Sequence, residues 1–117
     1  MHTILLVDDD AIIRIGVKTM LRNCEDFRVT AEAENGSTAL EICRKNAPDI
    51  VITDMKMPVM DGVELIRHLQ QLSAPPTILA LSGYDDYDLV RKALKYGAQD
   101  YLLKLDLSPR HIDECTT

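Results

Sequence analysis

Apolar and polar residues alternate along the chain in a pattern that predicts strands and helices in turn. Five short apolar runs are predicted strands, and they cover residues 4–7, 29–31, 50–53, 78–81 and 101–103. Short, wholly apolar runs are typical of strands that are buried on both faces of a parallel sheet. Between these runs, apolar residues recur at a spacing of three or four, which indicates helices with one buried face. Five repeats of strand and helix predict a single α/β domain with right-handed crossovers.

Turn and capping residues mark where the predicted helices begin and end. Asp10 is expected to cap the first helix, because Asp is a preferred N-cap and favours the positive helix end. Asp61-Gly62 is interpreted as a turn and helix start, and Gly97 as a helix stop. Ser108-Pro109 opens a short last helix, which can run to about Thr117 and carries few apolar residues. Met55, Met57 and Met60 are expected to pack in a loop rather than to hold a metal; they lie between two predicted elements.

Polar residues follow the predicted strands where the strands end. They are Asp8 and Asp9, Asp54, Ser82 and Lys104. In open parallel sheets, ligands bind outside the carboxyl ends of the strands, so we expect these side chains to converge at one edge. Each residue alone has an ordinary explanation, as a turn residue or an exposed lysine. Their joint placement after four strands favours a site.

Length and charge exclude several classes of protein. The chain has 117 residues, which is the size of one domain, and 46% of them are apolar. Asp and Glu number 19 against 13 Lys and Arg, a net charge of −6, which argues against nucleic-acid binding by this segment. No apolar run approaches the roughly 20 residues that span a membrane, and the first residues lack a signal-peptide pattern. Cys24, Cys43 and Cys115 are scattered, which favours a reduced, cytoplasmic compartment over a zinc site or a disulfide framework.

The expected cluster of three carboxylates suits phosphoryl chemistry. Three nearby carboxylates repel one another, and a hard divalent cation such as Mg²⁺ relieves the repulsion while keeping room for water and phosphate. A carboxylate can act as a nucleophile and accept a phosphoryl group, and a lysine can pair with a phosphate oxygen. Ser82 supplies a mobile hydroxyl donor. The sequence therefore predicts a metal-assisted phosphoryl site built from Asp8, Asp9, Asp54, Ser82 and Lys104.

Four ordered motifs carry a family resemblance that covers essentially the whole chain. They are Leu6-Val7-Asp8-Asp9-Asp10, Asp54-Met55-Lys56-Met57-Pro58, Leu81-Ser82-Gly83-Tyr84 and the run from Gly97 to Lys104. With these motifs the chain resembles the receiver domain of a two-component response regulator. The resemblance implies a flavodoxin-like, doubly wound sheet of five parallel strands in the order 2-1-3-4-5, with five helices. The stretch from Ser82 to Leu103 is most similar to receivers attached to AraC-type DNA-binding domains, with LuxR-type outputs as the main rival.

The resemblance implies a chemical role for each residue at the strand ends. Asp54 would be the phosphoacceptor for a phosphohistidine of a sensor histidine kinase. Asp9, Asp54 and the backbone carbonyl of Lys56 would bind Mg²⁺ or Mn²⁺ directly, and Asp8 mainly through water. Lys104 would bind a phosphoryl oxygen. The domain would be a signalling phosphoacceptor that catalyses only its own phosphorylation and dephosphorylation.

The resemblance also implies a switch and partners. The hydroxyl of Ser82 would swing to the phosphoryl group, and Tyr101 would rotate inward behind it. The face formed by the fourth helix, fifth strand and fifth helix would then change, and it would dimerise or contact an output domain. Residues 1–117 would be the receiver alone, with a DNA-binding output domain outside this chain.

One departure from the family and three alternatives bear on these expectations. The family usually has proline after the active-site lysine, joined by a cis peptide, whereas this chain has Leu105, so we expect a trans bond. The loop there and the reach of Lys104 are open. An interaction module that is never phosphorylated remains an alternative. An aspartate-nucleophile phosphatase would need an acid where Lys56 stands, and an FMN carrier would need a phosphate loop where Asp8, Asp9 and Asp10 stand.

Overall fold

Strands and helices alternate throughout residues 1–116, the part of the chain that the computed structural model describes. The strands are β1 (His2–Val7), β2 (Phe27–Ala33), β3 (Ile50–Asp54), β4 (Thr77–Ser82) and β5 (Asp100–Leu103). The helices are α1 (Ala11–Leu21), α2 (Gly36–Lys45), α3 (Gly62–Leu69), α4 (Tyr87–Tyr96) and α5 (Pro109–Thr116). Each predicted element is present, although β2 is longer than the short apolar run suggested. The predicted end of the last helix, Thr117, lies outside the described residues.

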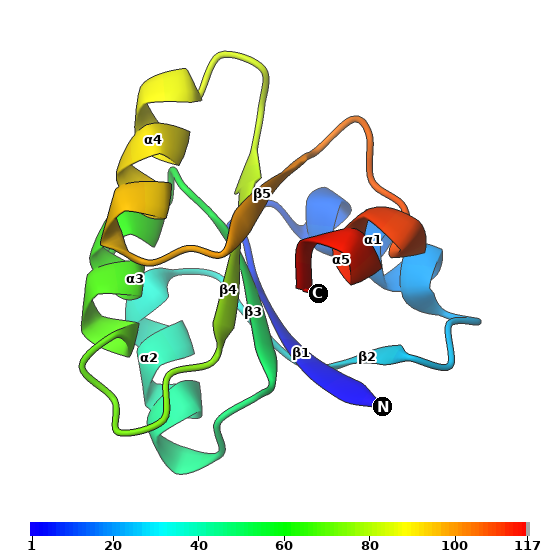
Figure 1. Ribbon diagram of the computed structural model, residues 1–117, viewed down its shortest axis with the longest axis horizontal. Coiled ribbons are helices and arrows are strands. Elements are labelled where there is room, and N and C mark those ends of the chain that lie inside the picture. The colour runs from blue at the N-terminus through cyan, green and yellow to red at the C-terminus, as the bar shows by residue number, and fades with distance from the viewer. Residues whose placement is uncertain (117) are drawn as a thin grey trace.

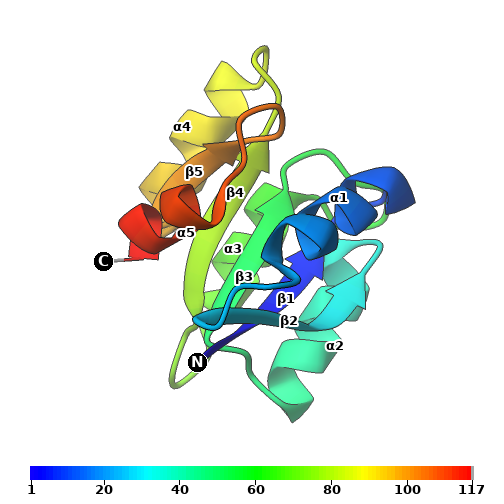
Figure 2. The same cartoon turned by 90° about the vertical axis from the view of Figure 1, so that its right-hand side faces the viewer.

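The five strands form one parallel sheet in the order β2-β1-β3-β4-β5. Helices α2, α3 and α4 cover one face, and α1 and α5 cover the other, so the sheet is the middle of three layers (Figure 1). The view turned by 90° looks onto the sheet from the side of α1 and α5, and the strands fan out behind these helices (Figure 2). The predicted doubly wound, flavodoxin-like fold is confirmed.

The sheet separates two apolar cores. Strand β1 contributes to both, because successive side chains of a strand point to opposite faces. Leu5 and Val7 pack with residues of α2, α3 and α4, whereas Ile4 and Leu6 pack with residues of α1 and α5. All four are fully buried. At about 25 cal/mol per Å² of buried apolar surface, two such cores supply the main stabilising free energy of the fold.

The predicted helix starts are confirmed by side-chain caps. The carboxylate of Asp10 accepts a hydrogen bond from the amide of Ile12, and that of Asp61 accepts one from the amide of Glu64, each at 2.9 Å. The hydroxyl of Ser108 accepts one from the amide of His111 at 3.2 Å. These acceptors satisfy amides that have no partner within their helices. The caps therefore place the first turns of α1, α3 and α5.

The loop after β3 packs tightly against the start of α3. Met55 is buried, and Met57 and Met60 pack against the same core, so the expectation of loop packing for these methionines is confirmed. The amide of Gly62 donates to the carbonyl of Met55 at 3.1 Å. This contact folds the loop back onto the end of β3, where Asp54 lies. Among residues 1–116, no helix is both long and apolar enough to cross a membrane.

Gly62 is expected to tolerate no side chain, because a Cβ there would lie 2.2 Å from the Asp54 carbonyl oxygen and 2.9 Å from the Met55 Cα. Gly62→Ala should lower the free energy of unfolding by about 3 kcal/mol through this overpacking. Gly16→Ala is the matched control, since a Cβ at that exposed helical position meets nothing within 4 Å. It should raise stability by about 0.5–1 kcal/mol. Urea unfolding of both variants tests this, and equal effects would contradict the close approach.

Candidate functional site

The parallel register aligns the carboxyl ends of four strands. Val7 lies opposite Thr53, Asp54 opposite Leu81, and Ser82 opposite Leu103. The residues that end or follow these strands therefore meet at one edge of the sheet, as the topology predicted. The main chain reinforces the alignment, because the amide of Lys104 donates to the Ser82 carbonyl at 2.9 Å.

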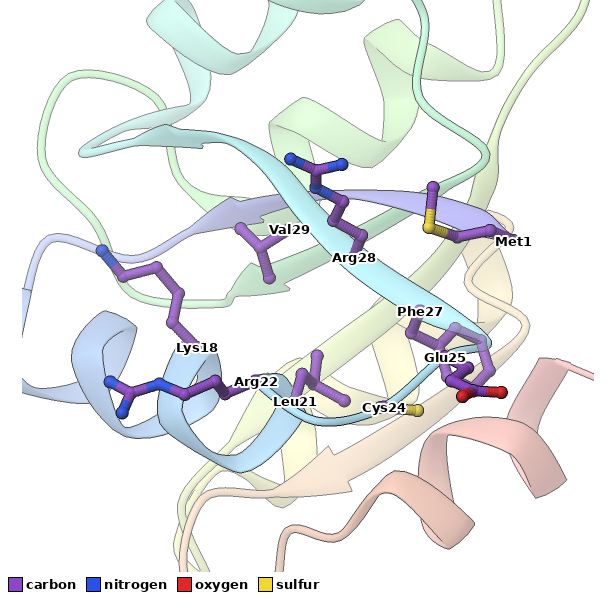
Figure 3. A pocket seen from close by; sticks show the side chains of 9 residues that line it. All are labelled: Met1, Lys18, Leu21, Arg22, Cys24, Glu25, Phe27, Arg28 and Val29. Carbon is purple, nitrogen blue, oxygen red and sulfur yellow. The ribbon is translucent and has the colours of Figure 1, made fainter.

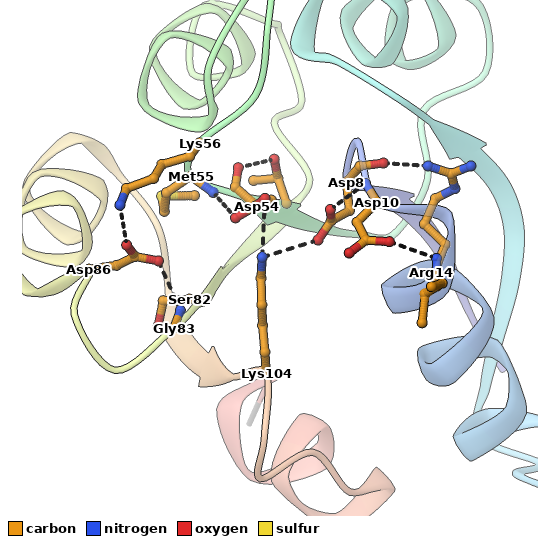
Figure 4. Close-up of polar contacts among 12 residues, drawn as sticks. Asp8, Asp10, Arg14, Asp54, Met55, Lys56, Ser82, Gly83, Asp86 and Lys104 are labelled. Carbon is orange, nitrogen blue, oxygen red and sulfur yellow. Dashed lines mark hydrogen bonds and ion pairs between the residues drawn. The ribbon is translucent and has the colours of Figure 1, made fainter.

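Three carboxylates gather at this edge. Oxygens of Asp8, Asp9 and Asp54 lie within 4.8 Å of one another. Asp8 and Asp54 are buried and Asp9 is exposed. One oxygen of each buried acid is held by an amide at 2.8 Å, that of Asp10 for Asp8 and that of Met55 for Asp54 (Figure 4). The other oxygen of each points into the space that the acids share with Lys104.

Lys104 crosses to the acids from the end of β5. Its Nζ lies 3.2 Å from Asp54 Oδ2 and 3.5 Å from Asp8 Oδ2 (Figure 4). Both contacts are ion pairs, and among residues 1–116 the buried Asp8 Oδ2 has no hydrogen-bond partner. Such an oxygen is costly in the interior of a protein. The expected convergence of Asp8, Asp9, Asp54 and Lys104 is present, and its least satisfied atom is the buried Asp8 Oδ2.

The pKa values of Asp8, Asp54 and Lys104 reflect the charge balance of the cluster. Burial raises the pKa of Asp8 to about 6, and the charges of Asp54 and Asp9 add to that effect. Burial also raises the pKa of Asp54, although Lys104 opposes it. The pKa of Lys104 is raised too, since the attraction of Asp54 and Asp8 outweighs its own desolvation. One ammonium group therefore does not balance three carboxylates, as is expected of a site that attracts a divalent cation.

The two predicted switch residues, Ser82 and Tyr101, lie on the neighbouring strands β4 and β5. Ser82 is buried, and its hydroxyl donates to the Leu102 carbonyl at 3.5 Å. Tyr101 is 44% exposed. Both line a groove of about 440 Å³ between β4, α4 and β5, with Tyr84, Tyr87 and Leu94 among the other lining residues. Ser82, predicted to turn toward the phosphoryl group, and Tyr101, predicted to rotate inward behind it, therefore line the same groove.

Lys56 makes a contact that the sequence did not indicate. Its Nζ lies 3.0 Å from Asp86 Oδ1, and Asp86 Oδ2 accepts a hydrogen bond from the amide of Gly83 at 2.8 Å (Figure 4). Burial raises the pKa of Asp86, but the Gly83 amide and Lys56 together hold it below its usual range. Asp86 thereby joins the loop after Asp54 to the loop after Ser82. Asp86 occupies the N-cap position of α4, but its side chain makes no capping hydrogen bond.

The segment after Lys104 settles the question raised by Leu105. Residues 1–116 contain no cis peptide bond, so the bond between Lys104 and Leu105 is trans, as expected for a residue other than proline. The Leu105 side chain is 81% exposed. With Leu105 in place of the family's usual proline, the Lys104 ammonium group lies 3.2 Å from Asp54 Oδ2.

A second hollow, of about 290 Å³, lies between the end of α1 and the start of β2 (Figure 3). Lys18, Arg22 and Arg28 line it together with apolar residues. This hollow shares no lining residue with the acidic cluster. The carboxylates, the ammonium group and the aligned strand ends that phosphoryl chemistry needs all lie at the cluster. The edge of the sheet is therefore the candidate functional site.

Comparison with known proteins agrees with this geometry. The sequence profile of the response regulator receiver domain matches residues 4–114. The chain belongs to the response regulator receiver family. It is 38% identical to the chemotaxis protein CheY of Bacillus subtilis over 88% of this chain and 85% of CheY. A solved two-component response regulator of the LuxR family from Aurantimonas sp. SI85-9A1 is 30% identical, with a TM-score of 0.84, over 97% of this chain and 81% of that one.

Other relatives of this receiver are longer. The transcriptional regulatory protein DegU of Brevibacillus brevis is 41% identical over 86% of this chain, but the match spans only 43% of DegU. The receiver thus spans less than half the length of that relative and most of the length of CheY. As a receiver, the chain is a component of two-component signalling.

Asp8→Asn is expected to stabilise the metal-free receiver above pH 6. Folding raises the pKa of Asp8 from 3.8 to about 6, so ionisation of Asp8 destabilises the folded receiver. With respect to Asp8, the receiver keeps its full stability below pH 3.8 and loses part of it progressively as the pH rises from 3.8 through about 6. That shift corresponds to about 3 kcal/mol, the upper limit of the gain expected for the variant. Urea unfolding in EDTA at pH 4 to 8 measures it.

The exposed Asp9→Asn variant serves as the control for this effect and should gain less stability. A gain for Asp8→Asn that is the same at pH 4 as at pH 8 would contradict the burial of an ionised Asp8.

Proposed function

We propose that this receiver is a phosphoacceptor switch in which Asp54 takes a phosphoryl group from a phosphohistidine of a sensor histidine kinase. The observation that carries the proposal is the Lys104–Asp54 ion pair of 3.2 Å inside a cluster of three carboxylates. Asp54 ends β3 with one oxygen held by the Met55 amide, so its carboxylate has a fixed direction. A fixed carboxylate beside a lysine suits nucleophilic attack on phosphorus.

The proposed reaction exchanges one bond for another. A carboxylate oxygen of Asp54 forms a bond to phosphorus as the bond between phosphorus and the imidazole nitrogen breaks, and the electron pair returns to that nitrogen. Lys104 stabilises charge on a phosphoryl oxygen, since positioning and charge neutralisation account for most of such catalysis. Water then attacks the phosphorus, the bond from phosphorus to the Asp54 oxygen breaks, and inorganic phosphate leaves as the carboxylate is restored.

The residues present fit a divalent cation. Asp8 Oδ2 is buried without a hydrogen-bond partner, and it lies in a set of carboxylate oxygens of the kind that Mg²⁺ prefers. Asp9, Asp54 and the backbone carbonyl of Lys56 would bind Mg²⁺ or Mn²⁺, and Asp8 would act mainly through water. The ion would neutralise charge between the carboxylates and the incoming phosphoryl oxygens.

Phosphorylation would change the conformation of Ser82 and Tyr101 and thereby the surface of the receiver. Ser82 would turn its hydroxyl from the Leu102 carbonyl to the phosphoryl group, and Tyr101 would move inward from its half-exposed position. The groove that both residues line supports this proposal, because it adjoins the surface of α4 and β5. We infer that the face of α4, β5 and α5 then dimerises or contacts an output domain, a local charge event biasing a two-state element.

Transcriptional output is the proposed readout. Relatives such as DegU are transcriptional regulatory proteins that extend beyond the matched region. We infer that residues 1–117 serve as one receiver and that a DNA-binding domain of AraC or LuxR type lies outside this chain. The net charge of −6 supports placing DNA contacts elsewhere.

Acetyl phosphate with Mg²⁺ should add one labile phosphoryl group to the receiver, measured as intact mass. Asp54→Asn should abolish the adduct, because it removes the nucleophilic oxygen. Asp61→Asn is the matched control, since Asn replaces Asp as a helix N-cap at little cost. An adduct that persists in Asp54→Asn, or a folded wild-type chain without an adduct, rules out Asp54 as the phosphoacceptor. The second result would favour an interaction module that is not phosphorylated.

Mg²⁺ should raise the melting temperature of the receiver, because it binds the native state. At a hundredfold excess over its dissociation constant, the gain is about 2.7 kcal/mol. Asp9→Ala should remove this gain, and since Asp9 is exposed the variant should fold. Asp26→Ala, an exposed acid just before β2, should keep it. Equal responses of the two variants in differential scanning calorimetry would show that the acidic cluster is not the metal site.

A further inference from the structure

Arg14 of α1 reaches back to the turn that carries the first two acids. Its guanidinium group is largely buried, with 13% of the side chain exposed. Nη1 donates to the backbone carbonyl of Asp8 at 2.5 Å, and Nε donates to Glu32 Oε1 at 3.1 Å (Figure 4 shows Arg14 beside Asp8 and Asp10). The side chain therefore contacts the site through main chain, without being one of the acids or a ligand.

The carbonyl that Arg14 holds belongs to the peptide between Asp8 and Asp9. Holding that oxygen restrains the orientation of this planar peptide, and the direction of the Asp9 side chain depends on that orientation together with the φ angle of Asp9. The neighbouring peptides are fixed independently, because the Asp8 amide donates to Ala33 at 3.1 Å and the Asp10 amide donates to Asp8 Oδ1 at 2.8 Å. The Asp8 carbonyl lies before the N-cap of α1, outside the hydrogen bonds of that helix. Arg14 thus completes the restraint of the turn.

Glu32 on β2 fixes the guanidinium group in turn. Its second oxygen, Oε2, accepts from Lys18 at 2.9 Å, so the carboxylate is held by two cations from α1. These contacts lower the pKa of Glu32, the hydrogen bond from Lys18 contributing most. Arginine suits this position because its planar fork donates in two directions at once, to the carbonyl and to Glu32. A lysine has a single nitrogen and would have to serve both acceptors from one point.

We propose that Arg14 is a positioning residue that sets the affinity of the acidic cluster for a divalent cation by fixing the Asp8–Asp9 peptide. This inference rests on the proposed function, in which Asp9 is a ligand. Partners that orient metal ligands typically change metal affinity 10- to 100-fold when removed. Arg14→Gln is therefore expected to raise the dissociation constant of Mg²⁺ by about that factor.

Isothermal titration calorimetry with Mg²⁺ tests the role, on wild type, Arg14→Gln, Arg14→Lys and Lys18→Gln. Lys18→Gln removes a cation from the same Glu32 but leaves the Asp8 carbonyl held, so its affinity should stay within about twofold of wild type. Arg14→Lys should fall between wild type and Arg14→Gln. Urea unfolding in EDTA separates lost affinity from lost stability, and if Arg14→Gln does not fold, Arg14→Lys and Lys18→Gln decide.

The outcomes separate this inference from the proposed function. Unchanged affinity in the Arg14 variants, or equal losses in the Arg14 and Lys18 variants, overturns the positioning role and leaves the metal site standing. Absence of Mg²⁺ binding by wild type overturns both the metal site and the role of Arg14, and the mass assay of Asp54 remains an independent test of phosphorylation.

Discussion

The candidate site is defined by one electrostatic constraint: three carboxylates lie against a single lysine at the edge of a parallel sheet. Two of these acids, Asp8 and Asp54, are buried, and burial of an ionised carboxylate without full compensation is costly. The amides of Asp10 and Met55 and the ammonium group of Lys104 compensate in part. The raised pKa of both acids and the unpartnered oxygen of Asp8 show what remains uncompensated. The apolar cores on both faces of the sheet offset that cost, and the site is left short of positive charge.

The surrounding segments hold this arrangement through main-chain contacts. Arg14 holds the carbonyl of Asp8, and Gly62 lets the loop after β3 return against Asp54. Asp86 ties the Gly83 amide to Lys56. The contacts at Asp8, Gly62 and Gly83 restrain the main chain beside candidate site residues, whereas the contact at Lys56 is an ion pair between side chains. A site that exchanges ligands needs restraint of the main-chain kind, because restraint of the functional atoms themselves would occupy them.

Local patterns and one topological rule predicted most of the fold and the cluster. Apolar periodicity located the five strands and the first four helices, and the Ser108-Pro109 start signal located the last helix. The rule that ligands bind at the carboxyl ends of parallel strands brought Asp54 and Lys104 together. The contacts of Arg14 and Asp86 were not predictable in this way, because each joins segments far apart through one long side chain whose rotamer depends on the finished fold. Val59 shows the same limit for the main chain. It has a φ of 70° in a tight turn closed from the Met60 amide to the Pro58 carbonyl at 2.8 Å, with no glycine or asparagine to indicate it.

The two lysines near Asp54 connect the site to the rest of the molecule. Lys104 contacts Asp54 and Asp8, while Lys56, two residues after Asp54, contacts Asp86 at the start of α4. On the proposed function, a phosphoryl group on Asp54 adds negative charge where both cations already have carboxylate partners. If the new charge attracts the Lys56 ammonium group, the ion pair between Lys56 and Asp86 weakens. The other oxygen of Asp86 accepts a hydrogen bond from the amide of Gly83, which follows Ser82. On that proposal, competition for cations would link the chemistry at β3 to the groove between α4 and β5.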